Sequence, residues 1–378
     1  MLLRCAHLFH NRIGLRPGPE SHISTLAARA GRVAKVIAMW HSVHVFYHEP
    51  DKDPLLLDAV RPLLADIRDY VEAAYVVRHW RQGPHVRVNV KADQRIWDEV
   101  VRPRIGTVVG GWLRDHPSTY VVDQAESLAR HRLMAAREQE HGPLTPWPAD
   151  NSIVEFPFDD RRHVLGGDEA VDLLTSFYSD STRLLFTMLD HCRDGRDGKS
   201  DLAMALLLTV AHTSHPIERS YLSFRVHAEG YLMWSKDPEA ARRSFDGVYD
   251  SRRALLTQRV RQVVDTIDGD GDSPFVREWA ALVETYRERA DRVVHLLPTM
   301  DDTPAETRGE LHALMFGTPG YRPDFLRYRV VLNYTYLHLT RLGLTPLDRF
   351  RTCHLLANAV EEVYGVSGVE SMRRHALG

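Results

Sequence analysis

Polar and apolar side chains alternate strictly along residues 85–90, which follow a Gly-Pro turn at positions 83–84. Because neighbouring side chains of a strand point to opposite faces, this alternation predicts a β-strand with one apolar and one polar face. The segment 75–80 before the turn is its expected partner in an antiparallel hairpin. Residues 40–48 alternate in the same way and predict another strand. The chain is therefore expected to begin with an antiparallel sheet.

Helical spacing dominates the rest of the sequence. Apolar side chains recur at helical intervals over 54–70, and the stretch 93–113 is also predicted to be helical. The proline-rich segment 142–157 is the best internal boundary, and after residue 166 the pattern is helical almost to the end. The further predicted helices are 168–192, 201–213, 216–234, 237–265, 273–296, 304–316, 324–342 and 346–363. The predicted fold class is α+β: an N-terminal antiparallel sheet with helices, followed by a largely helical C-terminal half.

The first 38 residues differ in composition from the remainder. They hold six Arg or Lys residues and one Glu, and no apolar run long enough for a signal peptide or a membrane helix. We interpret residues 1–38 as a disordered or non-native extension, with Met39 as the natural start. The remaining predicted parts are a single domain over 39–365, comprising a sheet-rich part 39–150 and a helical part 151–365, and a tail over 366–378. No other segment is apolar enough to span a bilayer, so we expect a soluble, cytoplasmic protein.

Charge balance and histidine content exclude several function classes. The 48 Lys and Arg residues are matched by 51 Asp and Glu residues, which argues against a nucleic-acid binder, because phosphate neutralisation usually demands a basic excess. The 21 histidines include no HExxH motif and no Cys/His set with zinc spacing, so no metal site is predicted. No phosphate-binding glycine fingerprint occurs. The three cysteines form no CxxC pair, which indicates a reducing compartment.

The polar side of the predicted hairpin is the strongest candidate for a functional site. Its residues are Arg81, His85, Arg87 and Asn89. An imidazole, a guanidinium and an amide in a row suit a bound carboxylate, a polarised amide carbonyl or a developing oxyanion. The alternative is the solvated outer face of a sheet, although such a face would more usually mix both charge signs.

Two further polar sets occur on predicted helices. The first, in 324–342, comprises Tyr334, Tyr336, His338 and Arg341, and the second includes Ser220, Ser223 and Arg225. A buried helix stripe with tyrosines is more often core than catalysis, so a packing role stays open for the first set. Hydroxyls and arginines on one helix are weak evidence of function by themselves.

These regions, in this order, resemble the small C-terminal elimination domain of class I lanthipeptide dehydratases and its stand-alone relatives in thiopeptide biosynthesis. The matching stretches are 40–47, 78–80, the His85-Val86-Arg87-Val88-Asn89 strand, 161–167, 177–182 and 336–343. The resemblance implies an enzyme that processes ribosomal peptides. Some members eliminate glutamate from glutamylated Ser or Thr. Others are pyridine synthases, which join two dehydroalanines in a formal (4+2) cycloaddition and expel the leader peptide.

Departures from the family pattern favour the second activity. Eliminating members usually carry His-x-Arg-x-Arg on the hairpin strand, and here Asn89 replaces the second Arg. Where the family has an Arg before the Gly-Gly pair, this chain has Val164, and Arg162 could replace that Arg only with a register shift. Where the family has a His near the C-terminus, this chain has Tyr336. Glutamate elimination needs cations for the leaving carboxylate and a general acid/base for the α-proton, and part of both sets is missing.

The resemblance therefore implies a stand-alone pyridine synthase without metal or redox cofactor. Tyr336 or His338 is the expected proton shuttle, and Arg87 with His85 is expected to polarise the reacting amide. The residues expected to bind substrate are Asn89, Arg81, Arg162, Ser220, Ser223, Arg225 and Arg341. The expected partner is a leader-bearing precursor peptide, with other maturation enzymes of the pathway as further candidates. Glutamate elimination and a non-catalytic role as a peptide-binding partner of a dehydratase are the alternatives, and the oligomeric state is open.

Overall fold

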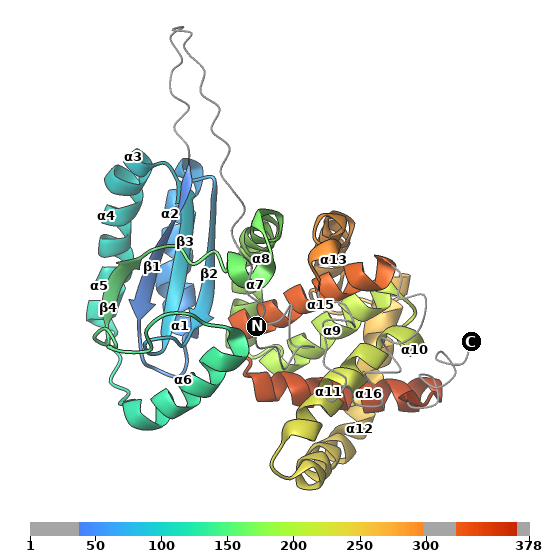
Figure 1. Cartoon of the computed structure of the whole chain (residues 1–378). Coiled ribbons are helices and arrows are strands. Elements are labelled where there is room, and N and C mark those ends of the chain that lie inside the picture. The colour runs from blue at the N-terminus through green and yellow to red at the C-terminus, as the bar shows by residue number, and fades with distance from the viewer. Residues whose placement is uncertain (1–37, 298–322, 369–378) are drawn as a thin grey trace, which may run out of the picture.

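The structure is a computed structural model that describes residues 38–297 and 323–368. Residues 1–37 of the expected extension, the expected helix 304–316 and residues 369–378 of the expected tail lie outside the described residues. The described chain has a sheet with helices at its N-terminal end and a helical C-terminal half, which confirms the predicted α+β class (Figure 1).

Four antiparallel strands form one sheet in the order β2-β3-β1-β4. The strands are β1 (Met39–Phe46), β2 (Ala73–His79), β3 (His85–Ala92) and β4 (Ser152–Phe156). The alternation predicted β1, β2 and β3, and β2 pairs with β3 as the expected hairpin. The register places Arg87 of β3 between His44 of β1 and Val77 of β2.

One face of the sheet is apolar and belongs to the hydrophobic core. Five valines of β1 and β3 are each at most 2% exposed: Val43, Val45, Val86, Val88 and Val90. Burial of such a side chain stabilises the fold by about 1.5–3 kcal/mol. Helices before and after the hairpin supply further side chains of this core, Leu56 and Trp97 among them. The alternation therefore fixes which face packs and leaves the polar face for other contacts.

These covering helices form two continuous runs. The first comprises α1 (Asp53–Leu55), η1 (Leu56–Val60), α2 (Arg61–Ile67) and η2 (Arg68–Tyr70), and the second comprises α3 (Gln94–Ile96), η3 (Trp97–Val101), α4 (Arg102–Arg104), η4 (Ile105–Val109) and α5 (Gly110–Asp115). The spacing predicted one helix for each run, and the structure adds π-helical turns at η1, η3 and η4. Pro62 and Pro103 follow η1 and η3, where a residue without an N–H interrupts the regular hydrogen-bond pattern.

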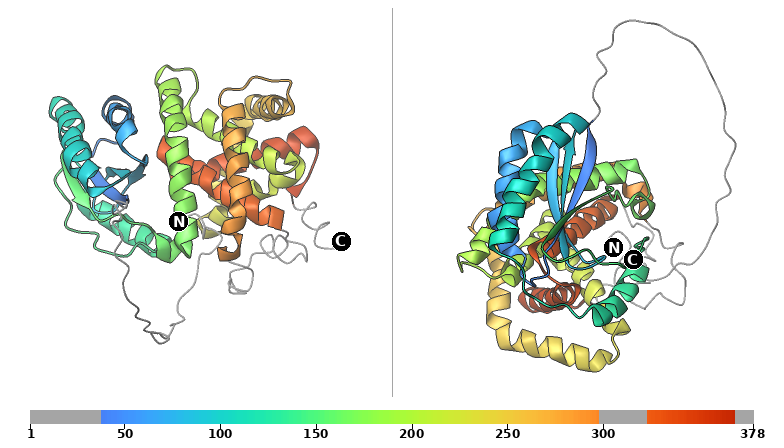
Figure 2. Two further views of the ribbon diagram at one scale, coloured as in Figure 1. Left: turned by 90° about the horizontal axis from the view of Figure 1, so that it is seen from above. Right: turned by 90° about the vertical axis from the view of Figure 1, so that its left-hand side faces the viewer.

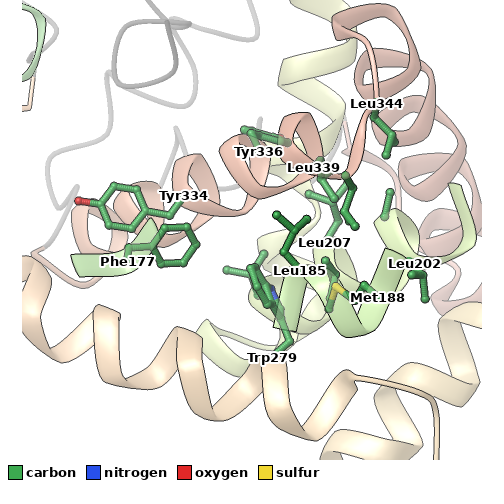
Figure 3. Packing of buried hydrophobic residues seen from close by; sticks show 14 of the residues in the cluster. Phe177, Leu185, Met188, Leu202, Leu207, Trp279, Tyr334, Tyr336, Leu339 and Leu344 are labelled. Atoms are coloured by element: carbon green, nitrogen blue, oxygen red, sulfur yellow. The ribbon is translucent and has the colours of Figure 1, made fainter. Parts of the chain in front are cut away.

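The helical half is built around α9 (Lys199–Ser214). Its ten residues from Leu202 to Ala211 are all buried, because neighbouring helices surround it. Figure 3 shows part of this core, with Leu207 of α9 near Met188 and Trp279. The other elements are α6 (Gln124–Glu138), α7 (Arg162–Leu165), α8 (Asp168–Arg193), α10 (Ile217–Ser220), α11 (Leu222–Trp234), α12 (Pro238–Asp268), α13 (Val276–Arg289), η5 (Ala290–Arg292), η6 (Val294–Leu296), α15 (Pro323–Leu342) and α16 (Pro346–Tyr364). Along the described segments, no helix is both long and apolar enough to cross a bilayer.

The edge strand β2 joins the sheet to the helical half. Both α8 and α15 pack against it, so the sheet stands beside the helices in Figures 1 and 2. The buried Arg341 of α15 donates from Nε to the Val76 carbonyl (2.8 Å) and from Nη1 and Nη2 to the hydroxyls of Ser181 and Thr182 (2.7 and 2.6 Å). Arg78 in return donates to the Arg341 carbonyl (2.8 Å). These bonds fix how the two parts meet and cover an otherwise open sheet edge.

The structure differs from the expectations at four places. β4 lies beyond the expected boundary at residue 150, so the sheet-rich part continues to Phe156. Helix α6 was not predicted from the sequence, because its polar composition gives only weak helical periodicity. It begins at an Asp123 N-cap. The predicted helix 216–234 is divided at Tyr221 into α10 and α11, and the predicted helix 273–296 ends as α13 at Arg289, before two 3₁₀ turns.

Candidate active site

The second face of the sheet is lined by polar and aromatic side chains that are almost fully buried. We call this set the polar face; its residues are Ser42, His44, Tyr75, His79, His85, Arg87 and Asn89. Ser42, His44, Tyr75, His85, Arg87 and Asn89 are each at most 6% exposed. The register aligns Asn89 with Ser42 and Tyr75, Arg87 with His44, and His85 with His79. The predicted alternative of a solvated outer face is therefore wrong for these residues.

Arg87 is the central cation of the polar face, and its guanidinium is only partly paired. Its Nη1 lies 3.3 Å from Asp159 Oδ2, and its Nε donates to His85 Nε2 at 3.3 Å. Its Nη2 is buried and has no hydrogen-bond partner among the described residues. Burial lowers the pKa of Arg87 to about 10, against the opposing effect of Asp159, so the group is still protonated at neutral pH. One N–H-bearing nitrogen of a charged group thus remains available for an acceptor.

The tautomer of His85 follows from its two partners. Its Nδ1 lies 2.8 Å from the Gly83 carbonyl, which can only accept, so Nδ1 carries the proton. Nε2 is then the acceptor for Arg87. Burial, and after it the neighbouring His79, hold the pKa of His85 well below its ordinary value. His85 is therefore a neutral ring with both nitrogens occupied, and its role here is to position Arg87.

His44 is the imidazole of this face whose nitrogens have no hydrogen-bond partner among the described residues. It stacks on His85 and on Phe156 with ring centroids 4.6 and 4.4 Å apart. No hydrogen bond to His44 occurs within the part of the chain that the structure describes. Burial, followed by the charges of Arg87 and Arg81, lowers its pKa to about 3. At neutral pH it is an uncharged ring that can accept a proton at one nitrogen and donate from the other.

The remaining cations around the polar face are paired with carboxylates. Arg81 donates to Glu140 (3.1 Å), and Arg161 forms an ion pair with the same carboxylate. His79 Nε2 lies 3.5 Å from Glu140, while its Nδ1 accepts the N–H of Arg81 (3.1 Å). The arginines are therefore held close to acids, and the face does not carry the uncompensated positive charge that a free anion would favour.

Aromatic side chains border the polar face. Tyr75 stacks on Tyr178 of α8 (5.0 Å), and Trp40 stacks on Phe158 (5.4 Å). The Arg341 guanidinium lies 5.2 Å from the Tyr178 ring centroid. Burial raises the pKa of Tyr178 to about 12, so its hydroxyl remains a donor at neutral pH. Planar, uncharged groups can stack on such surfaces.

Tyr336 and His338 lie in the helical core instead. His338 is fully buried, with Nε2 3.4 Å from Met188 Sδ and its ring 4.6 Å from that of Trp279. The Tyr336 hydroxyl lies 3.5 Å from Cys353 Sγ. Figure 3 shows Tyr336 on α15 among the buried hydrophobic residues. The expected union of these two side chains with Arg87 in one site does not occur, because their contacts all come from helices of the C-terminal half.

The other expected substrate-binding residues are also dispersed. Arg225 pairs with Glu361 (2.8 Å) and so joins α11 to α16, and Ser223 shares a hydrogen bond with Tyr328 (2.6 Å). Ser220 bonds weakly to a backbone carbonyl of its own segment. Arg162 lies on the surface beside Asp160 and Asp168, and Arg341 joins β2 to α8 and α15 as described above. Of the expected set, the structure brings together Arg81, His85, Arg87 and Asn89.

Three components of this region were not predicted as site residues. Asp159 and Glu140 lie in the connection between α6 and α7, where nothing in the sequence links them to the hairpin. His44 shares the alternating pattern of β1, and the pairing of β1 with β3 was the signal that would have placed it beside Arg87. No group of three or more His, Cys, Asp or Glu side chains in the described ranges is arranged to hold a metal ion.

Comparison with known protein families decides the membership of this chain. The family model described as lantibiotic biosynthesis dehydratase C-term matches residues 40–360. The chain belongs to this family. The match spans both the sheet and the helical half, so the two parts form one family unit. Comparison with curated proteins returns no significant match.

Two solved structures resemble this member of the dehydratase C-terminal family over nearly their whole length. The pyridine synthase TbtD, from thiomuracin biosynthesis, has 35% sequence identity and a TM-score of 0.73, with 87% of this chain and 99% of TbtD covered. TsrL has 20% identity and a TM-score of 0.66, with 89% and 99% covered. The likeness to TsrL concerns the fold alone, whereas the identity with TbtD is high enough to bear on function.

Proposed function

We propose that this protein is a pyridine synthase of thiopeptide maturation. The observation that carries the proposal is the 35% identity with TbtD, a pyridine synthase, over 99% of that protein's length. The substrate would be a linear ribosomal peptide that bears two dehydroalanines and a leader. The coarser assignment, an enzyme in the maturation of such peptides, also follows from the family membership.

The chemistry begins at an amide. The proton of the amide nitrogen of one dehydroalanine moves to the carbonyl oxygen, which creates a C=N–C=C diene. This diene adds to the alkene of the other dehydroalanine, so that two carbon–carbon bonds form and close a six-membered ring. The hydroxyl then leaves as water with a proton from the ring, and the leader leaves as its amide with a second ring proton. No external oxidant or reductant is required.

The free donor of Arg87 is better suited to an amide carbonyl oxygen of the peptide than to a carboxylate. A carboxylate binds arginine best through two parallel N–H groups. In Arg87, Nε already donates to His85 and Nη1 faces Asp159, so only Nη2 is free of protein partners. A single charged donor matches one carbonyl oxygen, which gains negative charge when the amide nitrogen gives up its proton. Glutamate elimination, which releases a free carboxylate, is the less favoured alternative.

His44 is placed to move the proton in this scheme. It lies opposite Arg87 in the β1–β3 register, is uncharged at neutral pH, and has both nitrogens free of described partners. A neutral imidazole can accept the amide proton at one nitrogen while it donates its own proton from the other nitrogen to the carbonyl oxygen, so that no imidazolium has to form beside Arg87. Tyr75 and Tyr178 supply a stacked aromatic border for the planar parts of the peptide. Tyr336 and His338 have no part in this mechanism.

The test is to incubate the protein with a leader-bearing peptide that contains two dehydroalanines and to follow its mass. The proposal predicts a macrocycle that has lost water and the leader amide, with the free leader amide in equal amount. Persistence of the linear peptide with tight binding would instead support a non-catalytic peptide-binding partner. Loss of glutamate from a glutamylated peptide, without ring formation, would support elimination.

A further inference from the structure

A second buried arginine, Arg349, lies in the helical half without an ion-pair partner among the described residues. It occupies the first turn of α16 and is 2% exposed. Its Nε and Nη2 are both buried, and neither has a hydrogen-bond partner within the described residues. Buried charges are ordinarily paired, because an isolated one loses its hydration without compensation. Two buried arginines of neighbouring helices do have acceptors: Arg341 donates to a backbone carbonyl and two hydroxyls, and Arg225 pairs with Glu361.

The two free nitrogens of Arg349 form one edge of its guanidinium. The N–H of Nε and the adjacent N–H of Nη2 point in the same direction, and this fork matches the two oxygens of a carboxylate. Arg87 offers no such edge, because its Nε is engaged by His85. The two arginines are therefore suited to different acceptors: Arg87 to a single oxygen and Arg349 to a two-oxygen anion.

A second unpartnered group lies beside Arg349. The His227 ring stacks between Tyr336 (4.5 Å) and Phe350 (4.6 Å), and its Nε2 is buried without a partner among the described residues. The Arg349 guanidinium lies 5.3 and 5.8 Å from the centroids of these same two rings. Burial and then the charge of Arg349 hold the pKa of His227 well below its ordinary value, so the ring is a neutral hydrogen-bonding group. An arginine fork and an imidazole nitrogen thus share one aromatic frame.

An acidic side chain on the hairpin side, Glu138, is influenced by the charge of Arg349 but has another hydrogen-bond partner. Glu138, at the end of α6, accepts the indole N–H of Trp80 (3.2 Å). Burial raises the pKa of Glu138, whereas the charges of Arg161 and Arg349 lower it. Glu138 is therefore within electrostatic range both of Arg161, beside the polar face, and of Arg349.

We propose that Arg349, with His227, binds a carboxylate of the peptide substrate, supplied by an acidic side chain or by the C-terminus. The proposal rests on the proposed function for the identity of the ligand as a peptide. It assigns to Arg349 a binding role and no part in the chemistry. The anchored carboxylate would set which segment of the peptide lies over the polar face.

Small probes test this site without any cyclisation assay. N-acetylglycine represents a peptide C-terminus, and the α-amide of N-acetylglutamate represents an acidic side chain; sodium chloride at equal ionic strength is the reference. The expected result is a saturable rise of the melting temperature for at least one probe with wild-type protein. The affinity of that probe should fall at least about tenfold in Arg349→Lys, which keeps the charge but loses the fork. Arg242→Gln, which removes a half-buried, ion-paired cation of α12, should bind as wild type does.

Equal probe affinity in wild type and Arg349→Lys would overturn the proposal. So would a chloride response equal to that of the probes, or the absence of a saturable response up to about 100 mM probe. If Arg349→Lys does not fold, His227→Phe keeps the ring stack, removes one hydrogen-bonding nitrogen, and should weaken the probe severalfold. Because no ring formation is measured, failure here leaves the pyridine synthase proposal standing. Conversely, probe binding together with no cyclisation would contradict the function and keep the carboxylate site.

Discussion

Arg87 Nε donates to His85 Nε2 at 3.3 Å, although only one residue separates the two along β3. The bond holds the buried guanidinium along the strand and occupies its Nε–H, which therefore cannot bind substrate. His85 is in turn fixed by the Gly83 carbonyl at the hairpin turn. The turn, the imidazole and the guanidinium thus form a chain that leaves Nη2 of Arg87 as the free donor.

The first prediction concerns Arg87 itself. Arg87→Lys keeps the charge but cannot both bond His85 and reach the substrate oxygen, so kcat for ring formation should fall about 100-fold or more. The melting temperature should change little by comparison. Arg95→Lys, at an exposed ion pair on α3, is the matched control and should leave the rate unchanged. A rate for Arg87→Lys within about threefold of wild type would exclude Arg87 as the polarising group.

The second prediction separates proton transfer from stacking at His44. In His44→Phe the contacts with Phe156 and His85 remain, but no proton can be carried, and the rate should fall about 100-fold. His41→Phe is the matched control, since His41 stacks on Trp97 on the opposite face of the sheet. Single-turnover rates measured by mass spectrometry distinguish the two variants. Equal rates would assign the proton transfer elsewhere.

The third prediction is that Arg341 stabilises the junction between the halves. Arg341→Met removes three hydrogen bonds of a fully buried guanidinium and leaves the Val76 carbonyl and two hydroxyls to find new partners. The free energy of unfolding should drop by about 3–5 kcal/mol. Urea denaturation checks this, with Arg253→Met on the exposed side of α12 as a control that should show no measurable change. A loss below about 1 kcal/mol for Arg341→Met would contradict the role.

The fourth prediction uses pH to test the core placement of His338. Burial holds the pKa of His338 well below the ordinary 6.5, so the folded ring stays neutral when the unfolded ring is protonated. The unfolded state then binds the extra proton below pH 6.5, and stability decreases as pH falls, by about 1.4 kcal/mol per pH unit for each such group. His338→Leu should flatten the dependence of unfolding free energy on pH between 6 and 5 by about that amount.

Cyclisation by His338→Leu should remain within about threefold of wild type, because His338 contacts Met188 and Trp279 and no residue of the polar face. An unchanged pH slope would mean that the ring is accessible to protons. A loss of activity comparable to that of Arg87→Lys would restore His338 as a catalytic residue.

Local patterns were enough to predict much of the fold. The two-residue alternation of β1 and β3 determined both the strands and the face that carries His85, Arg87 and Asn89. Helical spacing predicted α8, α9, α12, α15 and α16 to within a few residues. β4 was missed because it is short and pairs with a strand about a hundred positions earlier, and because the prolines on either side of it are typical of a loop.

The site was predicted only where neighbours in sequence are neighbours in space. Asp159 approaches Arg87 from 72 positions away, and no spacing rule signals such a pair. Tyr336 and His338 have the residue types of a catalytic set, yet their helix is apolar on most sides and buries them against Cys353 and Met188. A polar residue on a buried helix cannot be assigned to site or core until the packing partners are known.

The most direct test follows one oxygen atom. A leader-bearing peptide is prepared with ¹⁸O in the amide carbonyl next to the nitrogen of the dehydroalanine that forms the diene. If the polar face activates that amide for ring closure, wild-type protein gives a macrocycle without ¹⁸O, the label appears in released water, and Arg87→Lys gives almost none of this product. A product that retains the label, or conversion restricted to a glutamylated peptide with loss of glutamate alone, would contradict the account.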